Sequence, residues 1–446
     1  MPDLTDTIVA EATPPGRGSV RVIRISGSAA AALLGAAFVA SGVEPMERPR
    51  RLCLGTLLSA AGEPLDRVLA VWFPAPHSLT GEDVAEIHVH GGRGIVRGGL
   101  ESLERLGGRV ALPGEFSYRA YLNGKVSLME AEAVNALVEA ETAAQAVRVG
   151  GMLHGRLSED LANLRSELLS LRADWEARID FPEETGDGGA DRNRIAGLLE
   201  RLARLEEDGR AVRFMREGWR LALVGRVNTG KSSLFNALLK RERALVTPHP
   251  GTTRDVIEES IEVGGYPVVL QDTAGVRAAC DPVEAAGVVR SRETAGQADG
   301  TLFVYDAAAG WGSEDEILLA GLERPPIGIL ANKRDLPQSG ERREGALWVS
   351  ARTGEGLKEV VHLLERWMEG SLPRSIPALV CERQVEAVRR ASDGCREAME
   401  ALRAGYSEEV ALQGLGRAQR AMDELLGGSG GEQLYDLIFA RFCIGK

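Results

Sequence analysis

Residues 219–232 read WRLALVGRVNTGKS. The first part, WRLALV, is typical of a buried β-strand, and the second, GRVNTGKS, matches the pattern G-x-x-x-x-G-K-S. A helical pattern, SLFNALL, continues from residue 233. A strand, a glycine loop and a helix in this order predict a P-loop, whose backbone N–H groups curl around phosphate oxygens at a helix N-terminus. We expect Lys231 to reach the β- and γ-phosphates and the Ser232 hydroxyl to bind Mg²⁺.

A second motif, Asp272-Thr273-Ala274-Gly275, comes directly after the strand pattern VVLQ at 268–271. In this position the carboxylate of Asp272 lies near Mg²⁺, and the N–H of Gly275 can sense the γ-phosphate. A single P-loop match can arise by chance, and this second motif in the expected order supports it.

A third motif, Asn332-Lys333-Arg334-Asp335, follows the strand pattern at 327–330. There the Asp335 carboxylate can accept both N–H groups on the pairing edge of guanine. Adenine has no matching donor at N1, and losing such a pairing can cost about 10⁴-fold or more in discrimination. The segment Ser350-Ala351-Arg352 fits the loop that closes over the base. The ordered motifs predict GTP as the nucleotide, against the alternative that glycine turns join unrelated strands.

The expected GTP-binding residues come from these motifs and from the segment TPHPGTTRD at 247–255. Within that segment Thr253 is expected to bind Mg²⁺ together with Ser232. The full set is Gly225, Asn228, Gly230, Lys231, Ser232, Ser233, Thr247, Thr252, Thr253, Asp272, Gly275, Asn332, Lys333, Asp335, Ser350, Ala351 and Arg352.

Hydrolysis needs a group that positions the attacking water, and Ras-type GTPases use a Gln just after the Asp-x-x-Gly motif. Here that position is Val276, which cannot serve. The side-chain oxygen of Asn228 could hold a monovalent cation beside the phosphates, and residues 247–255 could complete the cage. Glu284 could fix the water through a second water. From the residues alone, a turn-forming Asn228 and a solvated Glu284 are equally open, and Arg277 is a weaker candidate for an arginine finger.

The composition limits the class of protein. A chain of 446 residues favours two to four domains, and 44% hydrophobic with 26% charged residues is ordinary for a globular protein. No apolar run approaches the roughly 20 residues that span a bilayer, and five cysteines without paired spacing predict reduced thiols in the cytoplasm. The net charge of −12 argues against a nonspecific nucleic-acid coat but leaves a specific RNA partner open.

Hydrophobic patterns divide the chain into regions of different texture. Strand patterns at 20–25, 68–73 and 84–90, with a helix expected at 94–106, predict a mixed α/β region up to about residue 125. A long helix follows, because apolar residues then recur at spacings of three and four, and Asp180-Phe181-Pro182 ends it. Its apolar seam consists of Leu157, Leu161, Leu164, Leu168, Leu171 and Trp175.

A second helix is expected to reach about residue 216, and helical pattern returns from about 376, with breaks near 405 and at 427–431. Between them, residues 219–370 alternate strand and helix signals, as a parallel-sheet domain does. We therefore predict a multidomain α/β plus α protein in which a Ras-like P-loop GTPase domain is inserted into a discontinuous helical domain. The expected boundaries are 1–125, 126–217, 218–371 and 372–446.

The outer motifs resemble one family, the tRNA-modification GTPase MnmE, also called TrmE. No shared GTPase core would produce them, and the likeness runs from end to end. The motifs are Thr13-Pro14-Pro15-Gly16-Arg17-Gly18, Gly81-Glu82-Asp83-Val84, Pro113-Gly114-Glu115-Phe116-Ser117, Asn123-Gly124-Lys125, Ile179-Asp180-Phe181-Pro182, Gly251-Thr252-Thr253-Arg254-Asp255 and Phe442-Cys443-Ile444-Gly445-Lys446.

The resemblance implies an N-terminal domain that binds 5-formyltetrahydrofolate or a related one-carbon folate and mediates homodimerisation. The positions that match the family's folate contacts are Arg24, Glu86, Lys125 and Lys446.

The resemblance also implies K⁺-stimulated hydrolysis, in which two GTPase domains of a dimer meet across their nucleotide faces. Asn228, Thr247, His249 and Thr252 match the K⁺-loop positions, and Glu284 matches the family's catalytic glutamate. With the FAD-dependent partner MnmG, the family adds an aminomethyl or carboxymethylaminomethyl group to C5 of the wobble uridine in tRNAs.

Two other functions compete with this interpretation. A ribosome-assembly GTPase switch would bind RNA, but helix continues after the GTPase region where such proteins carry an RNA-binding module. A folate-dependent one-carbon transferase with a regulatory GTPase would differ in its acceptor. His88 and His90 on one strand face favour a structural role over a metal site, and Cys443 is more consistent with a packed cysteine than with a reactive thiol or a lipid anchor.

Overall fold

The computed structural model describes residues 4–16, 18–153, 156–180, 189–241, 244–245, 257–272, 296–338, 341–371, 379–428, 438–440, 442 and 445. The chain separates into two compact units. The first consists of Met1–Asn135, Ser158–Glu167 and Gln419–Lys446, and the second of Ala136–Leu157 and Leu168–Ala418. Each unit is described by itself.

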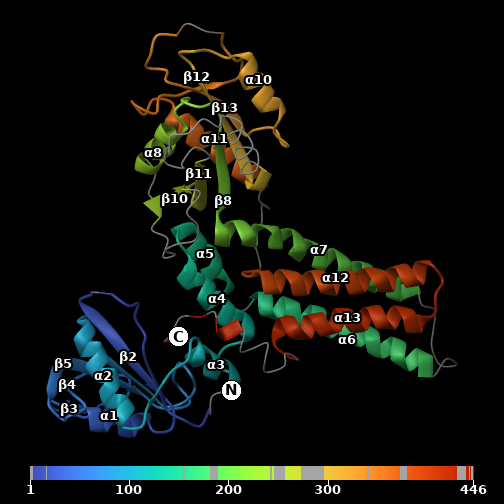
Figure 1. Cartoon of the computed structure of the whole chain (residues 1–446). Helices are drawn as coiled ribbons and strands as arrows, with labels where there is room; N and C mark the ends of the chain where they lie inside the picture. The colour runs from blue at the N-terminus through green and yellow to red at the C-terminus, as the bar shows by residue number, and fades with distance from the viewer. Residues whose placement is uncertain are drawn as a thin grey trace. The chain divides into compact units, whose positions relative to one another are not determined.

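The first unit is built around a seven-stranded sheet of order β3-β4-β5-β6-β2-β1-β7. Helices α1 (Ala30–Ala37) and α2 (Arg93–Arg105) cover one face, where they bury Ile23, Ile25 and Ile87 (Figure 1). The strands and the helix predicted for this region are confirmed. The strand bounds are β1 Ile8–Glu11, β2 Val20–Ser26, β3 Phe38–Ala40, β4 Cys53–Leu58, β5 Pro64–Phe73, β6 Val84–His90 and β7 Arg109–Val110, and a short 3₁₀ helix spans Pro45–Glu47.

A buried arginine joins helix α3 (Glu115–Leu122) to the start of the chain. The Arg119 side chain is 1% exposed and bonds to Asp6 at 2.6 Å and to Glu115 at 3.0 Å. It also lies 3.3 Å from Glu82 in the loop before β6. Hydrogen bonds from Arg109 and Arg119 lower the pKa of Asp6 against the opposing effect of burial. The charges are therefore paired, as buried ions must be.

Aromatic side chains from the end of the chain pack on the same unit. Phe439 lies 5.2 Å from Tyr118 and 6.2 Å from Tyr121 between ring centroids, and Phe442 lies 5.1 Å from Phe439. These rings form a small core with Leu128, at the start of α4 (Leu128–Glu139). The described part of the C-terminal segment is thus an integral part of the N-terminal unit.

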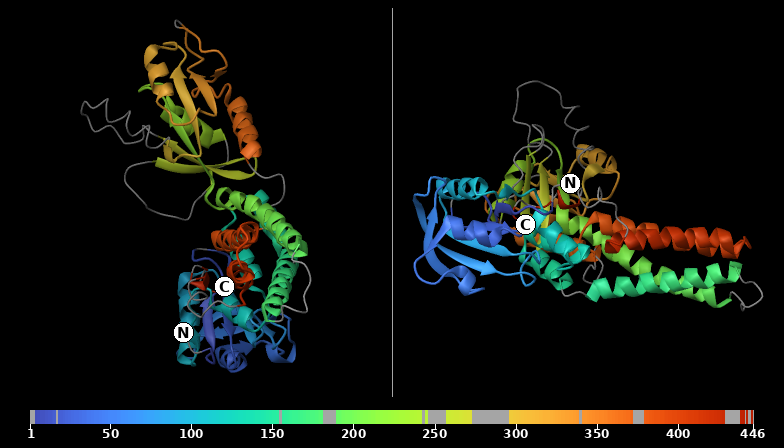
Figure 2. Two further views of the ribbon diagram at one scale, coloured as in Figure 1. Left: turned by 90° about the vertical axis from the view of Figure 1, so that its right-hand side faces the viewer. Right: turned by 90° about the horizontal axis from the view of Figure 1, so that it is seen from below.

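Long helices come from two segments on either side of the second sheet in sequence. They are α5 (Ala143–Met152), α6 (Arg156–Asp180), α7 (Gly189–Glu217), α12 (Glu382–Arg403) and α13 (Glu408–Leu426), and Figure 2 shows the last four as extended rods. The predicted seam on α6 is confirmed, since its members from Leu161 to Trp175 are at most 4% exposed. Helix α7 packs on α12 although the whole second sheet lies between them in sequence. None of the described helices is long and apolar enough to cross a membrane.

The second sheet has the order β14-β13-β12-β8-β11-β10-β9. Its first five strands are parallel, and β10 and β9 add to the edge in antiparallel pairs. The strand bounds are β8 Trp219–Val224, β9 Ala244–Leu245, β10 Ile257–Val263, β11 Tyr266–Asp272, β12 Gly300–Asp306, β13 Gly328–Asn332 and β14 Leu347–Trp348. The inserted parallel-sheet domain predicted from the sequence is confirmed.

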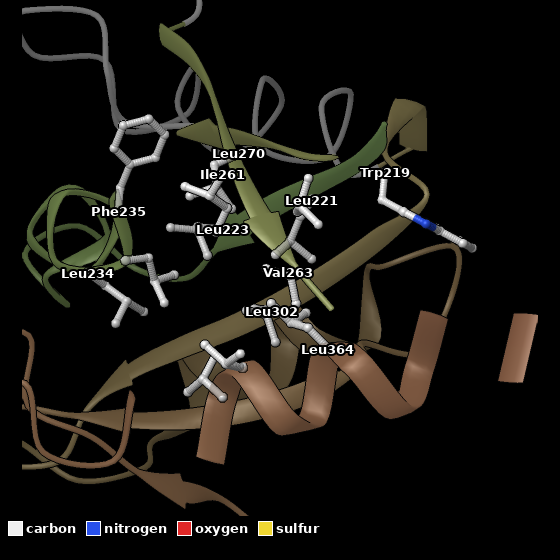
Figure 3. Close-up of a cluster of buried hydrophobic side chains, with 14 of the residues drawn as sticks. Trp219, Leu221, Leu223, Leu234, Phe235, Ile261, Val263, Leu270, Leu302 and Leu364 are labelled. Carbon is white, nitrogen blue, oxygen red and sulfur yellow. The ribbon is translucent and has the colours of Figure 1, made fainter. Parts of the chain in front are cut away.

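Helices α8 (Lys231–Arg241), α10 (Ser313–Ala320) and α11 (Leu357–Ser371) accompany this sheet. Leu234 and Phe235 of α8 join Leu221 and Leu223 of β8 in one core, with Leu364 of α11 (Figure 3). Burying a leucine or phenylalanine side chain stabilises a fold by about 1.5–3 kcal/mol. This core therefore fixes where β8 ends and α8 begins, which is where the P-loop lies.

The turn of the β10–β11 hairpin is fastened to α5. The Thr142 hydroxyl caps α5 and donates to the carbonyl of Gly265 at 2.6 Å, and Gln145 donates to the carbonyl of Met215. Gly265 has φ +83°, and a Cβ there would lie 2.7 Å from the Cβ of Ala144. Only glycine satisfies both constraints.

Two glycines allow α12 and α13 to approach closely. A Cβ on Gly394 would lie 2.6 Å from the carbonyl oxygen of Gly414, and a Cβ on Gly414 would lie 2.7 Å from the carbonyl oxygen of Gly394. Since both clashes involve helix backbone, neither can be relieved by a side-chain rotation.

We expect Gly394→Ala to destabilise the protein by about 1–3 kcal/mol, because the two helices must separate to admit the methyl group. Scanning calorimetry measures the change. Gly197→Ala on α7 is the matched control, because no atom lies within 4 Å of the added Cβ. There the helix propensity of alanine should stabilise by about 0.5–1 kcal/mol. Equal stability of the two variants would contradict the close helix contact.

Candidate nucleotide-binding site

The P-loop lies between β8 and α8, as predicted. Gly230 has φ +87°, and a Cβ there would lie 2.4 Å from Nδ2 of Asn332. A side chain at this position would therefore both strain the backbone and push away a neighbouring predicted site residue. Helix α8 starts at Lys231, immediately after this glycine, and its N-terminus carries the exposed Ser232 and Ser233.

The Lys231 side chain is turned into the loop. The residue is 6% exposed, and its Nζ donates to the carbonyls of Gly225 at 2.8 Å and Arg226 at 2.7 Å. The ammonium group thus lies against the backbone that would enclose the phosphates. An ammonium group in this position can neutralise the charge of a phosphate bound in the loop.

Asn332 connects the P-loop to the loop predicted to close over the base. It is 1% exposed and ends β13, where its backbone pairs with Asp306 of β12. Its Nδ2 donates to the carbonyl of Thr229 at 2.9 Å, and its Oδ1 accepts the N–H of Ala351 at 3.1 Å. The nitrogen and the oxygen of the amide both have hydrogen-bond partners. The P-loop, the base-recognition motif at 332–335 and the segment 350–352 therefore come together. The sequence placed Asn332 after its strand, whereas pairing with β12 makes it the last strand residue.

Asp335, the residue predicted to identify guanine, is held as a carboxylate. Its Oδ1 accepts the Ser350 hydroxyl at 2.6 Å, and its Oδ2 lies 2.8 Å from Nε of Arg352. The hydrogen bond from Ser350 lowers the pKa of Asp335, and the nearby Arg352 adds to the effect. Ser350 is itself fully buried and accepts the N–H of Thr353. The acceptor that guanine requires is thus present in its ionised form at neutral pH.

Lys333 bridges the base-recognition motif and the P-loop. It has φ +65°, and its Cε would lie 3.9 Å from a Cβ on Gly230. Its Nζ lies 2.6 Å from Oδ2 of Asp306.

Three charged residues near the site were not predicted from the sequence: Asp306, Arg226 and Asp315. Asp306 ends β12 at the same edge of the sheet as Asn332. Arg226 of the P-loop lies 2.8 Å from the fully buried Asp315, whose other oxygen accepts the N–H of Gly312 at the start of α10. A polar residue at the carboxyl end of a parallel strand is a signal that could have identified Asp306. Asp315 gave no such signal.

Of the other predicted nucleotide contacts, two lie on described parts of the chain, and the rest lie outside the described residues. Asn228 is exposed with φ +65°, and Asp272 ends β11 beside Leu223 of β8. The predicted residues outside the described part are Thr247, His249, Thr252, Thr253, Gly275, Glu284 and Lys446, together with Val276, Arg277 and Cys443.

In the first unit, three of the residues predicted to bind folate are described: Arg24 and Glu86 lie on the sheet, and Lys125 follows α3. Arg24 and Glu86 are paired across β2 and β6, with Nε and Oε1 2.9 Å apart. Arg24 also donates to the carbonyl of Gly445 at 2.8 Å, next to the predicted Lys446. The exposed Lys125 donates to the carbonyl of Pro76 at 2.7 Å. A cation and an anion are therefore presented side by side near the end of the chain.

The two histidines of β6 contact carboxylates. His90 lies 2.7 Å from Asp66, and His88 lies 3.7 Å from Glu86. Among the described residues, no three His, Cys, Asp or Glu side chains are grouped as a metal site would need.

Comparisons with known proteins agree with this arrangement along the whole chain. A family model described as "MnmE helical domain" matches residues 128–443, and one described as "GTP-binding protein TrmE N-terminus" matches residues 7–125.

Two relatives named "tRNA modification GTPase MnmE" show the same extent. The protein from Symbiobacterium thermophilum is 41% identical over 455 residues, and the one from Heliobacterium modesticaldum is 40% identical over 464 residues. Each alignment covers 99% of this chain and 99% of the relative. With the P-loop and the Asp335 carboxylate in place, the chain belongs to the MnmE family and is a GTPase of tRNA modification.

Proposed function

We propose that this GTPase acts with the FAD-dependent partner MnmG to add an aminomethyl or carboxymethylaminomethyl group to C5 of the wobble uridine of tRNA. The support is family membership over 99% of the chain. The proposal that the chain binds GTP is supported by the Asn332 amide, which joins the P-loop to the loop predicted to close over the base. The ribosome-assembly alternative has no comparable support from the relatives.

Each part of the proposed site has one task. Lys231 neutralises the β- and γ-phosphates, and Asp335 accepts the N–H groups of guanine. Ser232, on the first turn of α8, and Thr253 bind Mg²⁺, with Asp272 nearby. Hydroxyl and carboxylate oxygens are ligands that Mg²⁺ prefers. When bound, the ion would neutralise charge between the β- and γ-phosphates.

Hydrolysis would depend on K⁺ and on Glu284. The proposed K⁺ site combines Asn228 with Thr247, His249 and Thr252. Asn228 fits because it is exposed on the P-loop, where its side chain is open to solvent. The proposed catalytic Glu284 would fix the attacking water, which Val276 cannot do.

The N-terminal region would bind a one-carbon folate and form the homodimer. Folates carry carboxylates that suit Lys125, and a pterin ring whose N–H groups suit Glu86 and whose carbonyl oxygen and ring nitrogens suit the neighbouring Arg24. Lys446 would complete the site, since its neighbour Gly445 already contacts Arg24. We propose the boundaries 1–125, 126–217, 218–371 and 372–446 for the folate-binding, helical, GTPase and second helical parts.

Cells that lack this chain should lose the C5 substituent of the wobble uridine, and the wild-type gene should restore it. Mass analysis of digested tRNA measures the nucleoside. A Lys231→Ala variant should fail to restore it, whereas Lys240→Ala, at the exposed end of the same helix, should succeed. Unchanged wobble nucleosides in the deletion strain would overturn the proposed reaction. The assignment of the chain as a GTPase would not be affected by that result.

Asp335→Asn should shift the nucleotide preference from GTP towards xanthosine triphosphate. The asparagine amide donates a hydrogen bond where guanine also donates, whereas xanthine offers a carbonyl there. We expect GTP affinity to fall by about 10²-fold or more. Competition between the two nucleotides for a fluorescent analogue gives the ratio. GTP affinity equal to that of wild type would refute the base-reading role.

Turnover should rise at least about tenfold when K⁺ replaces Na⁺. The proposed oxygen cage would hold K⁺ beside the transferring phosphoryl group, where it acts as an arginine finger does, and the smaller Na⁺ would fit that cage less well. Asn228→Ala should remove this difference. The control is Asn193→Ala, an exposed asparagine on α7. Phosphate release measured in matched chloride salts tests both variants. Equal wild-type rates in the two salts would exclude the K⁺ site.

A further inference from the structure

Asp306 is a fixed carboxylate at the carboxyl end of β12. Its Oδ2 lies 2.6 Å from Nζ of Lys333, and its Oδ1 accepts the N–H of Ala308 at 2.9 Å. The Asp306 side chain is 19% exposed and that of Lys333 31% exposed. Because a backbone amide holds one oxygen, the other is set in place before any ligand binds.

Lys333 is fixed at its other end by the backbone. It follows the buried Asn332, and its carbonyl accepts the N–H of Leu336 at 3.0 Å. From there the side chain extends towards Gly230, where its Cε would lie 3.9 Å from an added Cβ. The methylene stem thus spans the space between the base-recognition motif and the P-loop, and Asp306 anchors its charged end.

We propose that Asp306 is a positioning residue for guanine nucleotides, acting through Lys333. This inference rests on the proposed assignment of Lys333 to the nucleotide site. A free lysine has many rotamers, and ordering its side chain costs up to about 2 kcal/mol. The ion pair orders the Lys333 side chain before the nucleotide binds. Its methylene stem can then contact the base without a further loss of side-chain entropy, and preorganisation of this kind strengthens binding.

The location of the pair predicts which step it affects. Asp306 and Lys333 belong to the side of the site that reads the base, and neither is placed at the γ-phosphate. The pair therefore stabilises bound GTP and bound GDP to the same degree. Removing an interaction that is equal in the ground state and the transition state raises KM and leaves kcat unchanged.

The competing explanation is that the ion pair only ties β12 to β13. The opposite end of β12 offers a matched comparison, because Asp299 has the same kind of partners. One of its oxygens lies 2.6 Å from Arg213, and the other accepts the N–H of Arg220 at 2.9 Å. A purely structural role would make the two aspartates equivalent.

The first test is Asp306→Asn, which keeps the shape and removes the charge. Affinity for both GTP and GDP should fall by about 5- to 30-fold, the range for a partly exposed charged hydrogen bond. KM should rise by a similar factor, with kcat within about twofold of wild type. Asp299→Asn should leave the affinities unchanged. Asp306→Glu, which keeps the charge, should recover most of the loss even if Asp306→Asn folds poorly.

A double-mutant cycle with Lys333→Met then separates positioning from structure. Methionine keeps most of the apolar stem and removes the ammonium group, so Asp306→Asn should have no further effect on affinity in that background. Additive losses, or an unchanged affinity in Asp306→Asn, would overturn the inference. If Lys333→Met binds as wild type does, the assignment of Lys333 fails. If wild type binds no guanine nucleotide, the whole proposed site fails.

Discussion

The buried amide of Asn332 is the interaction on which the candidate site depends. It is 1% exposed and bonds at one end to the P-loop carbonyl of Thr229 and at the other to the N–H of Ala351. A buried polar group that loses its partner costs about 1–3 kcal/mol. The P-loop and the loop predicted to close over the base therefore keep one relative position, set by the end of β13.

The β10–β11 hairpin links this edge to the helices. Strand β10 follows the segment expected to contribute Thr252 and Thr253, and β11 ends at Asp272. Its turn is held at Gly265 by Thr142, the cap of α5. One hairpin thus joins two segments predicted to contact the nucleotide to the helical part of the same unit, so that a displacement of either segment is transmitted along the hairpin and through the Thr142–Gly265 hydrogen bond to α5.

Much of the architecture could be predicted, because it depends on local patterns. The P-loop follows from the spacing of Gly225, Gly230 and Lys231, and the α6 seam follows from leucines at helical spacing. What escaped prediction depends on contacts between distant residues. Neither Gly394 nor Gly414 signals a helix crossing by itself, and Asp306 acquires its partner only when β12 lies beside β13. The roles of Thr247, His249, Glu284 and Lys446 stay predictions, because these residues lie outside the described part of the chain.

The pairing of α7 with α12 has a consequence for the order of synthesis. Ile195, Leu198 and Leu202 of α7 are buried, and its partner α12 begins only at Glu382. On a ribosome, α7 therefore emerges long before the helix that covers it, while β8 to α11 can complete their own core in the meantime. Until α12 has been made, the surface of α7 that packs on it lacks its partner helix.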